Sequence, residues 1–105
     1  MQYFMLKEEP LVSIIMNCHN GDRYLEESVK SIIAQTYQNW ELIFWDNVSS
    51  DESEKIINNF SDDRIKYYKS TDFKKLYESR NLAIQKANGK FLSFLDTDDI
   101  WQNDK

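Results

Sequence analysis

The chain has 105 residues, of which 41% are hydrophobic and 14% aromatic, and its formal net charge is −5. This length fits one domain or part of one, and the apolar content is too high for a disordered segment. The acidic balance excludes a general nucleic-acid binder, which needs a basic face for the phosphates.

The first half of the sequence alternates apolar runs with amphipathic stretches. Residues 1–10 have no clear period and are predicted to be a lead-in, so we expect the domain to span 11–105. The nearly continuous apolar run at 11–17 predicts a strand buried on both faces, although a buried helix has a similar composition. Residues at helical spacing then predict an amphipathic helix that ends near Gln35; they are Leu25, Val29, Ile32 and Ile33. The run at 41–46 repeats the buried-strand pattern.

The second half continues this alternation. Ser49 and Glu52 have capping-box spacing, which predicts the start of a second helix. The run at 64–69 is β-prone but carries charges, as expected for a strand near a sheet edge. A third helix is predicted at about 76–87, with Gly89 as its left-handed C-terminal cap.

The last predicted element is a buried strand at 91–95 that runs directly into an acidic turn. The regular alternation of strands and helices is typical of a parallel α/β sheet with right-handed crossovers. We therefore predict a Rossmann-like parallel sheet with strand order 3-2-1-4 and helices on both faces. Ligands of such sheets bind beyond the carboxyl ends of the strands, where the strand order reverses.

The sequence also bears on location. Cys18 is the single cysteine, so no internal disulfide can form, and no stretch has the pattern of a signal peptide. The longest apolar runs, at 14–16 and 42–45, are far shorter than the roughly 20 residues that span a bilayer. We expect a cytoplasmic protein without a transmembrane segment, and contact with the cytoplasmic face of a membrane is compatible with this prediction.

Polar clusters follow three of the apolar strands. They are Asn17, Cys18, His19 and Asn20 after the first, Asp46 and Asn47 after the second, and Asp96, Thr97, Asp98 and Asp99 after the last. In the predicted strand order, all three clusters meet at one edge of the sheet. Each cluster alone is weak evidence for a site, because Asp and Asn also form turns and helix caps.

The last cluster places three carboxylates within four residues, at Asp96, Asp98 and Asp99. Like charges this close together are unfavourable unless a cation or hydrogen-bond donors offset them. Mg²⁺ or Mn²⁺ is the natural partner, since these ions prefer oxygen ligands and are commonly held by carboxylates together with substrate phosphates. A nucleotide diphosphate is therefore the predicted ligand, and a solvated acidic turn that caps a helix is the alternative.

Other kinds of site do not fit. An EF-hand loop needs an oxygen ligand and then glycine where this chain has Ile100 and Trp101. The two glycines form neither GxxxxGK[ST] nor GxGxxG, which excludes glycine-rich phosphate loops. One cysteine and one histidine make a structural zinc site implausible. A receiver-like phosphorylation domain needs an acidic pair where Asn17 and His19 stand.

Four stretches resemble, in their order and spacing, the nucleotide-sugar-dependent inverting glycosyltransferases of family 2, which have the GT-A fold. They are VSII…CHN (12–20), SIIAQTY (31–37), ELI…DNVSSD (41–51) and SRN…G…DTDD (79–99). The resemblance implies metal-dependent transfer of a sugar from a nucleotide-diphosphate sugar, most often a UDP-sugar, to an acceptor hydroxyl in polysaccharide or glycan biosynthesis. It also implies that Asp98, and next Asp99, bind Mn²⁺ or Mg²⁺ within the DXD motif of the family.

The resemblance implies a set of nucleotide-binding residues as well. The set comprises Asn17, His19, Asn20, Asp46, Asn47, Arg80 and Asp96. His19 lies where an aromatic ring commonly stacks on the base, and Asp46 and Asn47 lie where an acidic pair meets the base and ribose. Arg80 lies where a cation reaches the nucleotide, and Asp96 lies where a family residue faces the ribose. Without the resemblance, Arg80 would be read as a paired surface charge and His19 as a packed loop residue.

Three positions depart from the family pattern. Asn47 replaces the second aspartate, which keeps hydrogen bonding but removes a charge, so the base preference stays open. Val48 occupies the usual place of a glycine, where a left-handed conformation would be strained. Asn17 stands where proline or a small polar residue is usual.

No catalytic residue is predicted within the chain, because the family's general base and most acceptor contacts lie in a later segment. We therefore expect the nucleotide-sugar-binding portion of a glycosyltransferase domain, without its acceptor half. The acceptor, a saccharide or a lipid-linked molecule, is not predicted. The alternative is a noncatalytic module that keeps the fold for nucleotide or partner binding, with a second copy covering the missing half.

Overall fold

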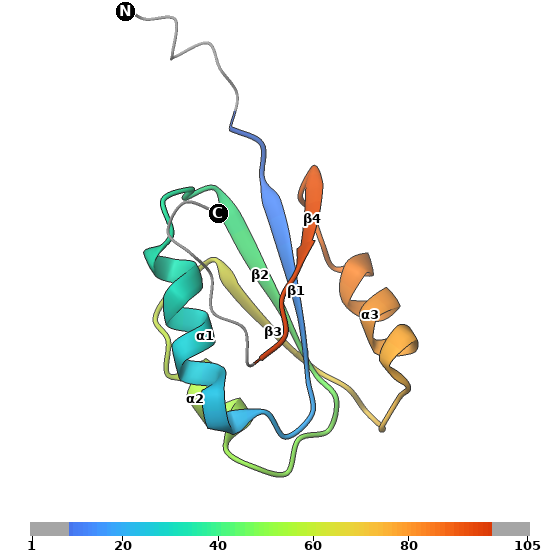
Figure 1. The fold of residues 1–105 in the computed structure, drawn as a ribbon. Helices are drawn as coiled ribbons and strands as arrows, with labels where there is room; N and C mark the ends of the chain where they lie inside the picture. Colours follow the sequence, from blue (N-terminus) through green and yellow to red (C-terminus); the bar gives the residue numbers. More distant parts are fainter. Residues whose placement is uncertain (1–8, 98–105) are drawn as a thin grey trace, which may run out of the picture.

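The computed structural model describes residues 9–97. These residues form a single sheet with helices between successive strands (Figure 1). The elements are β1 (Val12–Cys18), α1 (Asp22–Ala34), β2 (Trp40–Asp46), α2 (Ser53–Asn58), β3 (Ile65–Lys69), α3 (Leu76–Gln85) and β4 (Phe91–Phe94). The strands pair in parallel in the order β3-β2-β1-β4. The predicted Rossmann-like sheet and its strand order are confirmed.

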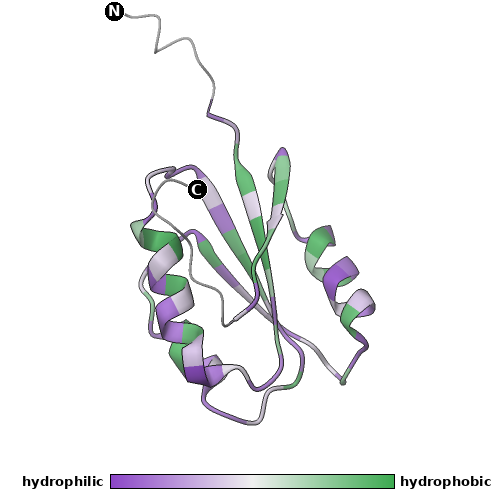
Figure 2. Ribbon diagram, in the orientation of Figure 1, coloured by the Kyte–Doolittle hydropathy of each residue, from purple (hydrophilic) through white to green (hydrophobic). Residues whose placement is uncertain are grey.

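Different helices cover the two faces of the sheet, as predicted. Helices α1 and α2 lie on one face and α3 lies on the other (Figure 1). Along β1, Ile14 and Met16 pack beneath α1 and α2, whereas Ile15 packs with Ala83 of α3. Because successive side chains of a strand point to opposite faces, both faces of β1 are apolar (Figure 2). The continuous apolar run at 11–17 is thus explained by burial on both faces.

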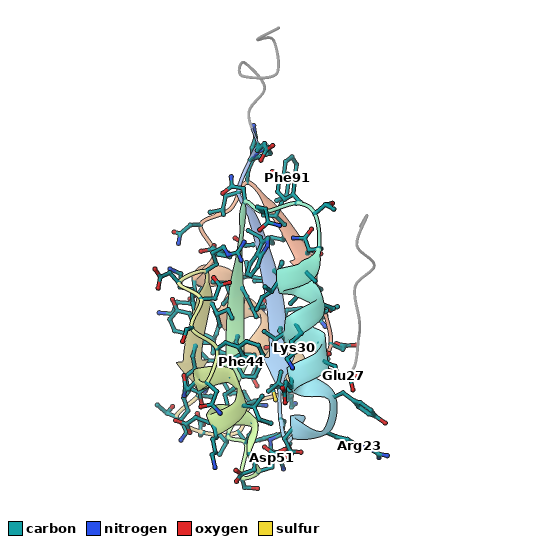
Figure 3. All side chains as sticks on the ribbon, turned by 90° about the vertical axis from the view of Figure 1, so that its left-hand side faces the viewer. Arg23, Glu27, Lys30, Phe44, Asp51 and Phe91 are labelled. Carbon is teal, nitrogen blue, oxygen red and sulfur yellow. The ribbon has the colours of Figure 1, made fainter. Side chains whose placement is uncertain are left out.

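Strand β4 is less buried than predicted. It forms an edge of the described sheet and pairs with β1. Phe91, Leu92 and Phe94 are 55%, 44% and 48% exposed, so the prediction of a buried strand is wrong within residues 9–97. Figure 3 shows Phe91 at the end of the sheet, away from the helices. An apolar run shows that a strand is suited to burial, and the neighbouring elements decide whether it is covered.

Two predicted helix caps are also wrong. Helix α2 begins at Ser53 with Glu52 as its N-cap, and the Ser49 hydroxyl instead accepts a hydrogen bond from the Asn20 N–H at 2.9 Å. Helix α3 ends in a right-handed C-cap, and Gly89 does not have a positive φ. In each case a contact from outside the helix determines the local conformation.

Gly89 is required because another strand passes close to it. A Cβ atom at this position would lie 2.5 Å from Ser13 Oγ and 2.7 Å from the Leu11 carbonyl oxygen. The Gly89 N–H donates to Ser13 Oγ at 2.8 Å, and that hydroxyl donates to the buried Glu41 carboxylate at 2.6 Å. The glycine therefore lets the chain enter β4 directly beside β1.

We expect Gly89→Ala to lower the free energy of unfolding by about 1–3 kcal/mol, because the added methyl group forces the backbone of β1 to move. Urea denaturation measures the change. Lys90→Ala, at the exposed neighbouring position, is the control and should be nearly neutral. Equal denaturation midpoints for the two variants would contradict this account of Gly89.

No helix within residues 9–97 combines the length and the apolar character needed to cross a membrane.

Candidate functional site

The carboxyl ends of β1 and β2 meet the segment between β3 and α3 at one edge of the sheet. A pocket of about 220 Å³ lies at this junction. Its lining consists of Asn17, Cys18, His19, Asn47, Phe73, Lys74, Lys75, Leu76 and Ser79. This is the edge at which parallel α/β sheets bind their ligands, and β1 lies where the strand order reverses.

Three of the predicted nucleotide-binding residues line this pocket: Asn17, His19 and Asn47. His19 Nδ1 lies 2.7 Å from the carbonyl oxygen of Asn47, and the imidazole packs edge-on against Phe73 with 4.8 Å between ring centroids. The structure thus brings the polar clusters after the first and second strands into contact. Phe73 comes from a third segment that the sequence analysis did not assign to the site.

Two polar atoms of the pocket have no hydrogen-bond partner within residues 9–97. They are Asn17 Oδ1 and Ser79 Oγ, and Ser79 is only 1% exposed. A buried polar group that stays unpaired costs about 1–3 kcal/mol, so the chain retains a destabilising feature here.

Ser79 was missed as a site residue. It lies on the helical stripe of Leu76, Ala83 and Ile84, and it is also the first residue of the SRN stretch that resembles the family. Its place in that stretch, and a hydroxyl on an otherwise apolar stripe near the start of a helix, were the available signals. Lys74 and Lys75, which bring positive charge to the pocket, gave no comparable signal.

Arg80 lies on α3 outside the pocket lining. Its guanidinium carbon is 5.2 Å from the ring centroid of Phe94, and its Nε is buried without a hydrogen-bond partner in the described part of the chain. The arginine also forms no ion pair within residues 9–97. It is therefore a half-buried cation stacked on an aromatic ring and not a paired surface charge.

Asp46 is completely buried, and both of its carboxylate oxygens accept hydrogen bonds from the protein. Oδ1 accepts from the Ser49 N–H at 2.9 Å, and Oδ2 accepts from the Tyr67 hydroxyl at 2.6 Å. Burial and this carboxylate together raise the pKa of Tyr67 far above its ordinary value. Asp46 stabilises the turn after β2 and joins it to the edge strand β3. It therefore has the turn-forming role that aspartate commonly has.

The turn after β2 has the unusual backbone that the sequence analysis considered. Val48 has a φ of 57°, which is a left-handed conformation and strained for a β-branched residue. Asn20 has a φ of 55° and stabilises the same region, since its Oδ1 accepts from the Ser50 N–H at 2.7 Å. Asn20 thus holds the loops after β1 and β2 together from the exposed side.

The acidic turn after β4 is only partly described. Asp96 is exposed, and the predicted metal ligands Asp98 and Asp99 lie outside the described residues. The last described residue, Thr97, contacts the start of α1: a Cβ atom on Gly21 would lie 2.6 Å from its Oγ1, and its carbonyl accepts from the Ser28 hydroxyl. The chain therefore enters the acidic turn beside the loop that follows β1.

Within residues 9–97, no three His, Cys, Asp or Glu side chains lie close enough together to hold a metal ion.

A larger hollow of about 420 Å³ lies at the opposite end of the sheet. It is lined mainly by apolar side chains, including Val12, Ile14, Trp40 and Phe91. This lining offers few polar groups that could orient a charged ligand. We therefore take the pocket at the carboxyl ends of β1 and β2 as the candidate site.

Comparison with known proteins agrees with the fold and the motifs. Residues 13–105 match the model of the family described as Glycosyl transferase family 2. The chain is 43% identical over 94 residues to the Escherichia coli protein WfgD, a UDP-Glc:alpha-D-GlcNAc-diphosphoundecaprenol beta-1,3-glucosyltransferase. This alignment covers 90% of the chain and 37% of WfgD, so the chain spans well under half of this relative's length.

Two solved structures share the fold. Staphylococcus aureus TarS 1–349 in complex with UDP matches with a TM-score of 0.82 at 23% identity, over 89% of this chain and 29% of that one. The mannosyltransferase PcManGT from Pyrobaculum calidifontis, in complex with GDP-Man and Mn²⁺, matches with a TM-score of 0.83 at 21% identity, over 90% and 29%. At these identities the likeness shows the GT-A fold. The matched family model and the close relative show that the chain belongs to glycosyl transferase family 2.

Proposed function

We propose that residues 11–105 bind the nucleotide of an activated sugar, with a UDP-sugar as the first candidate, for inverting transfer of the sugar to an acceptor hydroxyl. The observation that carries this proposal is the pocket at the ends of β1 and β2, where Asn17 Oδ1 and Ser79 Oγ are buried without partners among the described residues. The name of WfgD specifies UDP-Glc, and TarS was solved with UDP, which supports the choice of nucleotide.

The pocket suits the base and ribose better than a complete nucleotide sugar. Its volume of about 220 Å³ is below the roughly 300–1,000 Å³ of sites that enclose a drug-sized ligand. Asn17 Oδ1 accepts hydrogen bonds, whereas the Ser79 hydroxyl both donates and accepts, so together they match a ring edge that carries N–H and C=O groups. His19 and Phe73 supply aromatic surface at the same pocket.

We further propose that Asp98 and Asp99 hold Mn²⁺ or Mg²⁺ beside this pocket. Carboxylate oxygens are the ligands that these hard ions prefer, and the chain enters the acidic turn next to the loop after β1. PcManGT was solved with Mn²⁺, which supports the choice of ion. Such an ion stabilises negative charge on the departing diphosphate. The remaining proposed nucleotide contacts are Asn20, Asp46, Arg80 and Asp96.

The acceptor side of the reaction needs a general base to take the proton of the acceptor hydroxyl. No residue of this chain is assigned that role. Because WfgD is named for a diphosphoundecaprenol-linked acceptor, we propose a lipid-linked saccharide as the acceptor and the cytoplasmic face of a membrane as the place of reaction.

A noncatalytic module is the second candidate, favoured by the exposed apolar side chains of β4. In that case a partner or a second copy covers Phe91, Leu92 and Phe94, and the pocket stays empty. Titration with UDP separates the candidates, because only the donor-binding proposal requires nucleotide affinity.

We expect Ser79→Ala to weaken UDP binding roughly threefold to tenfold in isothermal titration calorimetry with Mn²⁺, because the ligand loses one hydrogen bond. The free energy of unfolding of the ligand-free variant should stay equal or rise, since the change removes an unpaired buried hydroxyl. If Ser79 were needed only for packing, the free energy of unfolding of Ser79→Ala would fall instead.

The matched control is Ser61→Ala, which truncates an exposed serine away from the pocket. In the same titration, Asp98→Ala should abolish the dependence of UDP binding on Mn²⁺. Undetectable UDP binding by the unmodified chain at millimolar concentration would contradict the donor-binding proposal and favour the noncatalytic module.

A further inference from the structure

We infer that Asn47 is a positioning residue, which shapes the nucleotide pocket by holding Lys74 and uses its side-chain amide for that purpose instead of contacting the base. This inference rests on the proposed function of the pocket. Asn47 Nδ2 donates to the Lys74 carbonyl oxygen at 2.8 Å, and Asn47 Oδ1 accepts from the Lys74 N–H at 3.0 Å. The residue is only 6% exposed, so both hydrogen bonds are largely shielded from water.

The backbone of Asn47 is engaged as well. Its N–H donates to the Cys18 carbonyl oxygen at 2.7 Å, and its carbonyl oxygen lies 2.7 Å from His19 Nδ1. Because a carbonyl oxygen only accepts, this contact assigns the proton to Nδ1 of the imidazole. One residue therefore joins three segments that line the pocket: the loop after β1, the end of β2 and the segment 72–75.

The two hydrogen bonds to Lys74 require an amide. An amide side chain presents one donor and one acceptor, which match the C=O and the N–H of a single backbone residue. An ionised carboxylate presents only acceptors, so one of its oxygens would face the Lys74 carbonyl oxygen without a proton between them. The family pattern has an aspartate at this position, and Asn47 therefore makes a pair of hydrogen bonds that an ionised aspartate could not make.

The consequence for the pocket follows from what segment 72–75 carries. Lys74 and its neighbours Phe73 and Lys75 line the pocket, and Phe73 packs against His19. Releasing the Lys74 backbone would move these side chains, and it would also remove the Phe73 ring from the imidazole of His19. Asn47 thus acts on the ligand through Phe73 and His19.

The test uses Asn47→Asp and Asn47→Ala, with UDP and Mn²⁺ as the probe. At about pH 7.5, both variants should bind UDP roughly tenfold or more weakly than the unmodified chain. At about pH 4.5 the new carboxyl group should regain its proton, because burial and the facing Lys74 carbonyl oxygen raise its pKa above the ordinary value of about 3.9, and the aspartate variant then again has one donor and one acceptor. Its affinity relative to the unmodified chain should then recover, whereas the relative affinity of Asn47→Ala should stay low.

Other groups around Asn47 also titrate or carry charge, so every affinity is expressed relative to the unmodified chain at the same pH. These groups are Cys18 at the end of β1, His19 from the loop after it, Asp46 from β2, and the ion pair of Lys74 with Asp72 at 2.7 Å. They are present in all three proteins, and only the aspartate variant adds a new titrating group. A recovery confined to Asn47→Asp therefore reports that group.

A ligand-free measurement separates this inference from the proposed function. Hydrogen exchange of the Lys74 amide, followed by NMR, should be slow in the unmodified chain and fast in Asn47→Ala, which removes the acceptor of this N–H. If the aspartate variant is too unstable at neutral pH, its melting temperature relative to Asn47→Ala should rise on acidification.

Retained protection of the Lys74 amide in Asn47→Ala, together with unchanged UDP affinity in Asn47→Asp at neutral pH, would overturn the inference. If the Asn47→Ala variant loses protection of the Lys74 amide but the unmodified chain does not bind UDP, the inference about Asn47 stands and the proposed function is overturned.

Discussion

Replacing Phe44 by alanine should lower the free energy of unfolding by about 3–5 kcal/mol, which is the usual cost of removing a large aromatic side chain from a packed core. Phe44 lies in the middle of β2 and has no exposed surface. Its ring stacks on Tyr67 with 5.8 Å between centroids, and it lies in the core beneath α1 and α2. Figure 3 shows it behind these two helices. The deletion therefore leaves a cavity that several elements surround.

Phe91→Ala is the matched control, because the same atoms are removed from a side chain that is 55% exposed. The free energy of unfolding of this variant should fall by roughly 1 kcal/mol or less, since the deleted side chain buries little apolar surface in the folded chain. Urea denaturation at neutral pH measures both variants. Similar decreases in the free energy of unfolding of Phe44→Ala and Phe91→Ala would contradict the finding that β2 is buried whereas β4 is an exposed edge strand.

Removing the Asp46 carboxylate should cost about 2–3 kcal/mol, because two buried donors, the Tyr67 hydroxyl and the Ser49 N–H, lose their acceptor. Asp46→Ala and Tyr67→Phe, with the double variant, form a mutant cycle. The two single losses should add to more than the loss of the double variant, because both changes remove the same hydrogen bond. Simple additivity would contradict a direct interaction between the two side chains.

The same pair predicts how stability depends on alkaline pH. The pKa of Tyr67 is raised in the folded state, so the folded chain keeps this proton at pH values where the unfolded chain releases it. The contribution of Tyr67 to the free energy of unfolding is complete below its unfolded-state pKa of about 10 and is lost progressively as the pH rises above that value. The Tyr67→Phe variant should therefore lose less stability than the unmodified chain when the pH is raised above about 10, as measured by urea denaturation.

The order of elements could be predicted because β1 and β2 are buried on both faces and their runs at 11–17 and 41–46 are mostly apolar. Strand and helix periods then alternate clearly enough to fix the topology. The burial of β4 could not be predicted, since an apolar run carries no information about which element covers it. The caps at Ser49 and Gly89 failed for a related reason: Ser49 pairs with Asn20, and Gly89 is constrained by Ser13.

The position of the candidate site followed from the strand order, which brings the residues after β1 and β2 together. Its third side was not predictable, because Phe73 and Lys74 belong to a segment without a recognisable motif and the resemblance of the SRN stretch pointed to Arg80 instead of Ser79. The role of Asn47 was also hidden, since its partner is the backbone of Lys74 and any residue except proline offers the same two groups. Sequence patterns report side-chain chemistry, whereas this contact depends on how two loops approach.

The central claim is that the pocket formed by the ends of β1 and β2 and the start of α3 binds the nucleotide. Titrating the isotopically labelled chain with UDP and Mg²⁺, and following backbone amides by NMR, tests it most directly. Saturable shifts should appear at His19, Asn47 and Ser79, with the residues around Trp40 and Phe91 at the other end of the sheet unaffected. Shifts confined to Trp40 and Phe91, or no shifts at millimolar UDP, would contradict the account.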